Sequence, residues 1–298
     1  GARWQRFRHN DTQELRRRQQ MPDTPESLAT IPMLERGDLD PNVKTIPTEI
    51  ESVGRSRLLF HDLFTNGIFY LDLGFNLHNL PAAYLPYVPL FSRALTETGT
   101  PTESFVQLLQ RIGRSTGGIR PSLFTSAMQG SDQGEAWLFL RGKAMAAQTG
   151  DLLSILRDVL SGARLDNRER IRQMALESKA GLESALIDMG HHIVGSRIQA
   201  HFNEADWASE QMSGVGQLFF LRDLVDRIDN DWPAVQETFE TLRSLLVNQH
   251  SLLANVTIDR AGGQDVLPQV RDFLAAQPDA EITSAVWESG LRPGDEGL

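Results

Sequence analysis

The sequence predicts an α+β domain, in which an antiparallel-dominated sheet carries helices packed on one face and a helical connector precedes the sheet. Two observations predict this class. First, residues 68–77 alternate strictly, with apolar side chains at every odd position and mixed side chains at the even positions, as in a strand buried on one side only. Second, the predicted strands come in pairs, and pairs of amphipathic helices follow them.

The N-terminal part reads as an inter-half connector over residues 1–51. A polar helix is predicted over residues 11–20, and the three prolines that follow, Pro22, Pro25 and Pro32, indicate an irregular path or a tight helical corner. The α+β domain is predicted over residues 52–280, and residues 281–298 are predicted to form a tail.

The first strands are predicted over residues 56–63 and 67–77, as a hairpin about Asn66-Gly67, because both residues tolerate the positive φ of a type I′ turn. The apolar side of the second strand is predicted to face the helix-covered core. Its members are Phe69, Leu71, Leu73, Phe75 and Leu77.

Later elements follow from periodicity and from start and stop signals. Asp166 is predicted to cap the longest helix, with Glu169 completing a capping box, and Gly190 is predicted to end it. Pro233 fits the first turn of another helix. Further strands are predicted over 117–129, 135–145 and 251–259, and helices over 80–99, 102–114, 151–161, 166–189, 205–228, 231–246 and 266–276.

Composition bounds the function. The net charge of −10 disfavours nucleic-acid binding and is compatible with basic peptide partners. No cysteine is present, which excludes disulfides, thiolate zinc sites and cysteine nucleophiles. No apolar run is long enough for a transmembrane helix, and the N-terminus does not resemble a signal peptide, so a soluble protein is expected.

The seven histidines show no H-E-x-x-H or H-x-x-E-H spacing. One local cluster holds His191, His192 and His201 with Glu204 and Asp206. It is interpreted as polar residues at a helix end followed by an irregular stretch, with a zinc site as the alternative. Phosphate-binding glycine loops and a G-x-S-x-G elbow are absent, so we assign no catalytic, cofactor-binding or metal residue.

Several blocks resemble the presequence-protease branch of the pitrilysin-type (insulinase-type) zinc metallopeptidases. They are "LFTNGIFYLDLGFNLHNLPAAYLPYVPLFSRALTETGT", "RIGRSTGGIRPSLFTS", "EQMSGVGQLFFLRDLVDRIDNDWPAVQETFETLRSLL" and "LLANVTID". Upstream, "ELRRRQQMPDTPESLATIPMLERGDLD" resembles the connector between the two halves of these enzymes. The resemblance covers nearly the whole chain.

The resemblance implies a part of a longer peptidase. Members have four related α+β domains in two halves that close around a chamber, where unstructured peptides are degraded, and their zinc motif H-x-x-E-H lies in the first domain. This chain resembles the connector and the third domain, so it is expected to be a non-catalytic, chamber-forming part, with zinc only in the full-length parent. The mixed side of the strand over 67–77 would then face the chamber or the other half of the enzyme: Ile68, Tyr70, Asp72, Gly74 and Asn76.

The expected partners are the remaining domains of the parent and, in the parent, unstructured peptides, with no nucleic acid and no membrane. Self-association of the isolated chain is also expected. The compartment would be cytoplasmic in a bacterium and organellar, in a mitochondrion or chloroplast, in a eukaryote. Two alternatives stay open: a free-standing protein-interaction module derived from a catalytically dead homologue, and an independent hydrolase that uses an unrecognised triad or the histidine cluster.

Overall fold

A computed structural model describes residues 12–131, 133–288 and 290, and it divides the chain into two compact units, 1–45 and 46–298. In the first unit, residues 12–20 are helical, which confirms the predicted polar helix; residue 11 lies outside the described residues. A single turn, α2 (Pro25–Leu28), is capped by the Thr24 side chain, and a 3-10 turn η1 (Arg36–Asp38) follows. None of the described residues of this unit is buried.

The second unit is built on one six-stranded sheet with the order β1-β2-β6-β3-β5-β4. Only β2 and β6 run parallel to each other; every other neighbouring pair is antiparallel. The five predicted strands share this sheet, which confirms the prediction of an antiparallel-dominated α+β domain. The strands are β1 (Glu49–Val53), β2 (Ser56–Asp62), β3 (Ile68–Asn76), β4 (Ile119–Ala127), β5 (Gly134–Met145) and β6 (Leu252–Ile258).

The predicted hairpin between the first two strands is wrong. Asn66 and Gly67 do adopt positive φ values of 54° and 76°, so the turn itself is made. However, β6 lies between β2 and β3, pairing with β2 on one side and with β3 on the other. The apolar side chains at alternate positions of β6 are buried in the centre of the sheet, and this long-range burial outweighs the local turn signal.

Strand β1 was not predicted, because residues 37–52 are typical of an extended, turn-rich path to the first strand. It is an edge strand whose backbone pairs with β2 through a turn at Gly54, where φ is +59°. Its one large apolar side chain between the two glutamates, Ile50, is 69% exposed, so β1 lacks the alternation that marks a half-buried strand.

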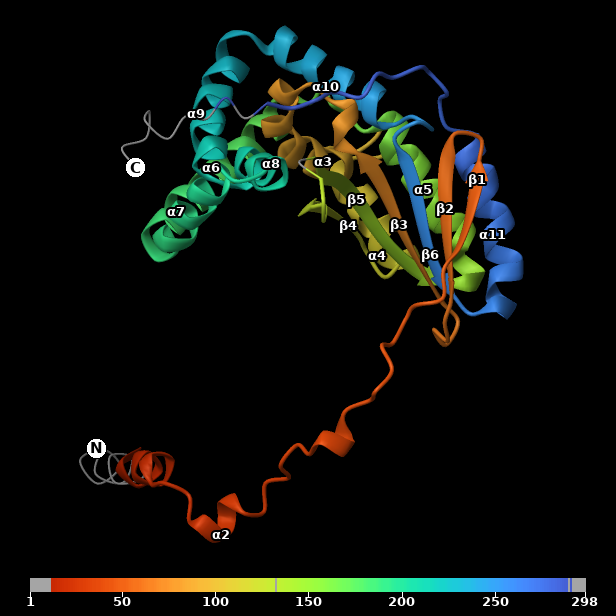
Figure 1. The fold of residues 1–298 in the computed structure, drawn as a ribbon. Coiled ribbons are helices and arrows are strands. Elements are labelled where there is room, and N and C mark those ends of the chain that lie inside the picture. The colour runs from red at the N-terminus through yellow and green to blue at the C-terminus, as the bar shows by residue number, and fades with distance from the viewer. Residues whose placement is uncertain (1–11, 132, 289, 291–298) are drawn as a thin grey trace, which may run out of the picture. The chain divides into compact units, whose positions relative to one another are not determined.

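Helices cover one face of the sheet, as α5 and α11 behind the strands in Figure 1 illustrate. The predicted apolar side of β3 lies against these helices. Its members are at most 1% exposed: Phe69, Leu71, Leu73, Phe75 and Leu77. This confirms which side of the strand is the core. The same face receives the buried residues of β5, among them Leu138 and Leu140.

Most predicted helices form, with shifted ends. Ser104 rather than Thr102 begins α4, since Ser104 and Gln107 make a capping box. Asn167 rather than Asp166 caps α6, because its side chain accepts the backbone N–H of Arg170. The elements are η2 (Leu77–Asn79), η3 (Ala82–Tyr87), α3 (Val88–Glu97), α4 (Phe105–Ser115), η4 (Ala146–Gln148), α5 (Thr149–Gly162), α6 (Arg168–Asp188), α7 (Gly190–Gln199), α8 (Glu204–Ser213), α9 (Val215–Asn230), α10 (Trp232–Leu246) and α11 (Arg260–Ala275).

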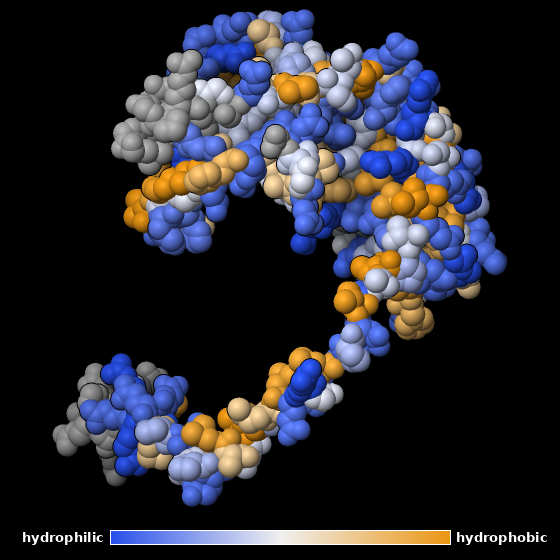
Figure 2. Space-filling view, viewed as in Figure 1, coloured by the Kyte–Doolittle hydropathy of each residue, from blue (hydrophilic) through white to orange (hydrophobic). Residues whose placement is uncertain are grey.

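The predicted irregular stretch after Gly190 is wrong, because Gly190 begins the helix α7. Helix α6 packs on α9. The apolar stripe that the sequence predicts for α6 is buried only in its first half. Its members are Ile171, Met174, Ala175, Ser178, Leu182, Ala185, Leu186 and Met189. Apolar side chains therefore remain exposed over the end of α6 and over α7, as Figure 2 shows. They are Leu186, Ile187, Met189, Val194, Ile198 and, just beyond α7, Phe202.

Residues 277–288 run without regular structure along the second unit. Trp287 is buried, stacks on the His78 ring at 4.1 Å, and donates its indole N–H to the carbonyl oxygen of Leu80. Among the described residues no helix is both long and apolar enough to cross a membrane.

Candidate functional site

Among the described residues of the second unit, no helix covers the other face of the sheet (Figure 1), and we call this the open face. Strand alternation selects its members, because every residue that follows a buried one points the opposite way. Cross-strand register then places them in rows: Asp72 lies opposite Arg141 of β5 and opposite Asn255 of β6, and Tyr70 lies opposite Lys143 and Thr257. The open face thus joins strands that are far apart in the sequence.

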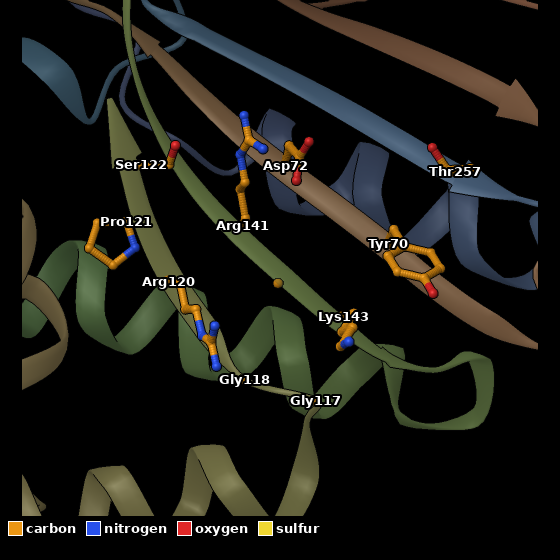
Figure 3. A pocket seen from close by; sticks show the side chains of 11 residues that line it. Tyr70, Asp72, Gly117, Gly118, Arg120, Pro121, Ser122, Arg141, Lys143 and Thr257 are labelled. Atoms are coloured by element: carbon orange, nitrogen blue, oxygen red, sulfur yellow. The ribbon is translucent and has the colours of Figure 1, made fainter. Parts of the chain in front are cut away.

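A pocket of about 760 Å³ lies over β3, β4, β5 and β6 on this face. Figure 3 shows the cationic side chains of Arg120, Arg141 and Lys143 rising from β4 and β5, with Asp72 and Tyr70 on the neighbouring β3. The stem of Lys143 lies over Gly117, where an added Cβ would come within 2.7 Å of its Cγ atom. Gly117 therefore permits this close approach of side chain and backbone.

A second pocket of about 520 Å³ adjoins the first, since Asp72 and Arg141 line both. Its floor is aromatic: the Phe139 ring lies 6.2 Å from the Trp137 ring and 6.5 Å from the Phe124 ring, centroid to centroid. An added Cβ at Gly74 would stand 2.6 Å from the Phe139 ring, so the glycine makes room for it. The two pockets form one trough that crosses the sheet, with a cationic half and an aromatic half.

The charge of the trough is opposite to that of the chain. Four cationic side chains and two carboxylates line the two pockets, whereas the chain carries −10. Among the described residues, none of Arg57, Arg120, Arg141 and Lys143 lies within ion-pair distance of a carboxylate. The trough thus presents positive charge that its own side chains leave uncompensated.

His61 is the one histidine that lines the trough. Its Nδ1 lies 2.9 Å from the carbonyl oxygen of Pro47 and 3.2 Å from Thr48 Oγ1, and its Nε2 lies 2.6 Å from Asn255 Oδ1. The carbonyl oxygen of Pro47 and the side-chain amide of Asn255 thus hold the two ring nitrogens of His61. The geometry therefore holds the ring in place rather than forming a nucleophile–base pair.

The structure does not assemble the histidine cluster. His191 and His192 lie exposed on α7, while Glu204 Oε2 accepts the backbone N–H of Gly134 at 2.7 Å. Asp206 Oδ2 accepts from the Asn203 side chain at 2.6 Å. Within residues 12–131, 133–288 and 290, no group of three or more His, Asp or Glu side chains could hold a metal ion. The residues present do not fit a zinc site.

The alternation of β3 placed Tyr70 and Asp72 on this side of the sheet, but the trough residues of the other strands were not predicted, although both strands of the β4–β5 pair were. The available signal was the outward set of β5, which runs Glu135, Trp137, Phe139, Arg141 and Lys143 between buried small or apolar residues. A strand side that carries two aromatic residues, of which Trp137 is only 9% exposed, next to two cations indicates a binding surface rather than a solvated one. Only cross-strand register, which the sequence does not show, adds Arg120 and Phe124 to it.

Comparison with known proteins finds a family model for the peptidase-associated region of family M16, subfamily C, which matches residues 8–224. Presequence protease 1, chloroplastic/mitochondrial, of Arabidopsis thaliana is 37% identical over 96% of this chain and 27% of its own length. Protein HypA of Clostridium perfringens is 26% identical over 97% of this chain and 30% of its own length. The chain thus spans less than a third of the length of these relatives.

Two solved structures share the fold. A conserved protein from Enterococcus faecalis V583 matches with a TM-score of 0.57 and 11% identity, over 83% of this chain and 56% of that one. The peptidase M16 inactive domain from Pseudomonas fluorescens matches with a TM-score of 0.51 and 16% identity, over 81% of this chain and 54% of that one.

Proposed function

The chain belongs to the peptidase-associated family of M16 peptidases, subfamily C, and on that premise we propose that the open face of its sheet forms a peptide-contacting wall of a longer zinc metallopeptidase. The single observation that carries this proposal is the trough, a continuous hollow on a sheet face that no helix covers. Its size lies in the range of sites that take ligands, and it combines apolar rings with charged groups.

The contribution of this region is proposed to be orientation rather than bond chemistry. An unstructured peptide loses conformational freedom when an extended surface aligns it, and a peptidase that holds it in one orientation lowers the entropic part of its barrier. The open face offers an aromatic platform for apolar side chains and fixed charges for polar ones. The zinc chemistry is proposed to lie in another part of the longer protein.

Two expectations follow for this chain alone: no stoichiometric zinc, and no cleavage of peptides. Metal analysis of protein prepared without chelator, together with a quenched-peptide assay, measures both. Zinc near one per chain with chelator-sensitive cleavage would contradict the proposal that the zinc chemistry lies in another part of the longer protein. It would support the independent-hydrolase alternative instead.

The exposed apolar side chains of α6 and α7 are proposed to contact another part of the longer protein. Contiguous apolar surface of this kind tends to find a partner, so the isolated chain is expected to self-associate through it. Light scattering over a dilution series tests this, with Ile187→Glu expected to shift the chain toward monomer. A chain that is monomeric at every concentration would contradict the proposed contact.

Peptide binding itself is tested with a fluorescently labelled, unstructured peptide and this chain, by anisotropy. Phe124 and Phe219 are a matched pair, because both are exposed phenylalanines, at 45% and 61%, but only Phe124 lies on the open face. Phe124→Ser is expected to weaken binding several-fold, and Phe219→Ser to leave it unchanged. Equal effects of the two changes, or no binding at all, would overturn the proposal. The compartment is expected to follow the source, organellar in a eukaryote and cytoplasmic in a bacterium.

A further inference from the structure

The cationic half of the trough contains an unfavourable arrangement. Arg120 of β4 and Arg141 of β5 are direct cross-strand partners, and Lys143 follows Arg141 two positions along the same side of β5. Like charges directly opposite each other destabilise a sheet. Asp72 of β3 lies opposite Arg141 on its other side, so Arg120 and Lys143 are the cations left without an acidic cross-strand neighbour. We propose that Arg120 and Lys143, bordered by Arg141, bind a carboxylate of the peptide, an inference that rests on the proposed peptide-contacting function.

Several cations of the helical layer are paired within the chain, although Arg157 of α5 has no carboxylate partner among the described residues. In the helical layer, Arg93 pairs with Glu97 and Glu177, and Arg111 pairs with Glu103 and Asp158. By contrast, within the described part of the chain no ion pair joins Arg120, Arg141 or Lys143 to a carboxylate, so an incoming anion would supply the missing partner. Arginine suits this task, because its planar fork matches the two oxygens of a carboxylate.

The side chains leave space for such a group. In Figure 3, Arg120 extends toward Gly118, whereas Arg141 extends in the other direction, toward Asp72. Gly118 has φ +103° and nothing within 4 Å of an added Cβ, so the floor beside Arg120 is open. Asp72 would repel a second carboxylate at its own end of the pocket. The anion is therefore placed on the side of Arg120 and Lys143, with Arg141 bordering it.

The aromatic half of the trough determines which side chain of the peptide should lie near the carboxylate. Phe139 and Trp137 precede Arg141 by two and four residues, about 7 and 13 Å along an extended strand. The Arg141 guanidinium lies 5.4 Å from the Phe139 ring centroid, so the two halves adjoin. An extended peptide with an apolar side chain two to four residues from a carboxylate would fill both. The local positive charge thus favours acidic rather than basic segments at this place, although the whole chain is acidic.

The carboxylate can come from the C-terminus of a peptide or from a Glu side chain, and the peptides separate these sources. We would measure binding of this 298-residue chain to a short labelled peptide that ends Leu-Ser-Glu, in four forms: unchanged, C-terminally amidated, with Gln for Glu, and with both changes. The form that removes the bound carboxylate is expected to bind about tenfold more weakly, as for loss of a charge-assisted hydrogen bond.

The chain variants test whether the named cations carry this preference. Arg120→Gln and Lys143→Gln are expected to abolish the discrimination between carboxylate and neutral peptides, by weakening only the former. Arg57→Gln, on the same face but in the other pocket, is the matched control and should keep the tenfold ratio. Melting temperatures within experimental error of the parent chain would show that the variants fold.

The outcomes distinguish this inference from the proposed function. If all four peptides bind equally, and Phe124→Ser weakens them all, the open face binds peptides but the carboxylate subsite is wrong. A ratio that Arg57→Gln reduces as much as Arg120→Gln does would also overturn the subsite, because it would show general electrostatic attraction. If no peptide binds, both the function and the subsite fail.

Discussion

The two faces of the sheet differ in what their side chains contact. On the covered face of β3, Leu71 and Leu73 are 0% exposed and touch the helical layer; between them Asp72 points to the open face. Adjacent residues of one strand therefore face a packed interior and an unfilled trough. The contrast teaches that the covered face is shaped by packing within the chain, whereas the open face presents cations and aromatic rings that no helix of the second unit covers.

Polar groups show the same contrast. Glu210 of α8 is completely buried, yet its carboxylate accepts hydrogen bonds from Arg197, from Gln211 and from the backbone N–H of Gly216. In the helical layer a charge that loses water gains partners. On the open face, cations retain water and lack ionic partners, which is the arrangement expected of groups that exchange water for a ligand.

The largest expected effect on the free energy of unfolding comes from a substitution on the covered face. Leu73→Asp would bury an unpaired carboxylate among apolar side chains, and we expect a loss of about 4 kcal/mol or more in the free energy of unfolding, or failure to fold. Asp72→Asn, one residue away on the open face, should change it by less than about 0.5 kcal/mol. Urea denaturation of both variants measures the difference, and comparable losses would refute the assignment of the two faces.

A smaller difference in stability is expected between removing a buried carboxylate, Glu210, and removing one on the open face, Glu135. Glu210→Ala leaves the Gly216 N–H and part of the Arg197 guanidinium without their buried acceptor, so we expect a loss of about 2–3 kcal/mol. Glu135 on the open face accepts a single hydrogen bond, from the indole N–H of Trp137, and Glu135→Ala should cost about 1 kcal/mol or less. Chemical denaturation at neutral pH tests the order, which an equal loss would contradict.

Sequence patterns could predict the covered face because its signal is local. The alternation of residues 68–77 and the helical stripes of Leu85 to Leu95 each reflect burial against the core, and the structure confirms both. Where pairing depends on distant segments, prediction failed: β6 enters between β2 and β3 from nearly two hundred residues away. A turn signal at Asn66-Gly67 specifies the backbone of the turn but not the neighbour of the strands that leave it.

The candidate site was less predictable still. Several trough residues lie in the blocks that carry the family resemblance, but no motif assigns them a role, and Arg120 meets Arg141 only through the register of β4 with β5. The same limit applies to α7, whose low apolar content gives little periodicity, although the chain is helical there. The family resemblance and most elements of the fold were therefore predictable from local sequence patterns, whereas the trough is visible only in the structure.

A third prediction concerns the arginines of the two sides. Arg93→Gln removes ion pairs to Glu97 and Glu177 and is expected to cost about 1 kcal/mol, since these groups are partly shielded from water. Arg141→Gln should instead change stability by no more than about 0.5 kcal/mol, because Arg141 lies between a like charge, Arg120, and an opposite charge, Asp72. Thermal melts decide this. A clear loss for Arg141→Gln would mean that the open face is a structural surface.

The smallest expected effect is the acid response of the helical layer. The hydrogen bond from Arg93 holds the pKa of Glu177 below its ordinary value of 4.5, and the hydrogen bonds from Arg172 hold the pKa of Asp229 below 3.8. Groups with a depressed folded-state pKa stabilise the protein above their unfolded pKa, and this contribution is lost as the pH falls through the folded value.

Stability should therefore decline as the pH falls below about 4.5. Glu177→Gln and Asp229→Asn should each flatten that decline slightly, whereas Glu281→Gln, an exposed control in the tail, should leave it unchanged. Denaturation midpoints measured across this range provide the test. A decline that neither of the first two variants alters would show that these ion pairs do not contribute to acid sensitivity.

The central claim is that peptides meet the open face and not the helical layer. A photo-reactive, unstructured peptide cross-linked to this chain and mapped by mass spectrometry tests it most directly. We predict adducts in the strands that border the trough, within β3 around Tyr70 and Asp72 and within β5 from Trp137 to Lys143, with loss of these adducts when unlabelled peptide competes. Competable adducts confined to the helical layer or to α7 would contradict the claim.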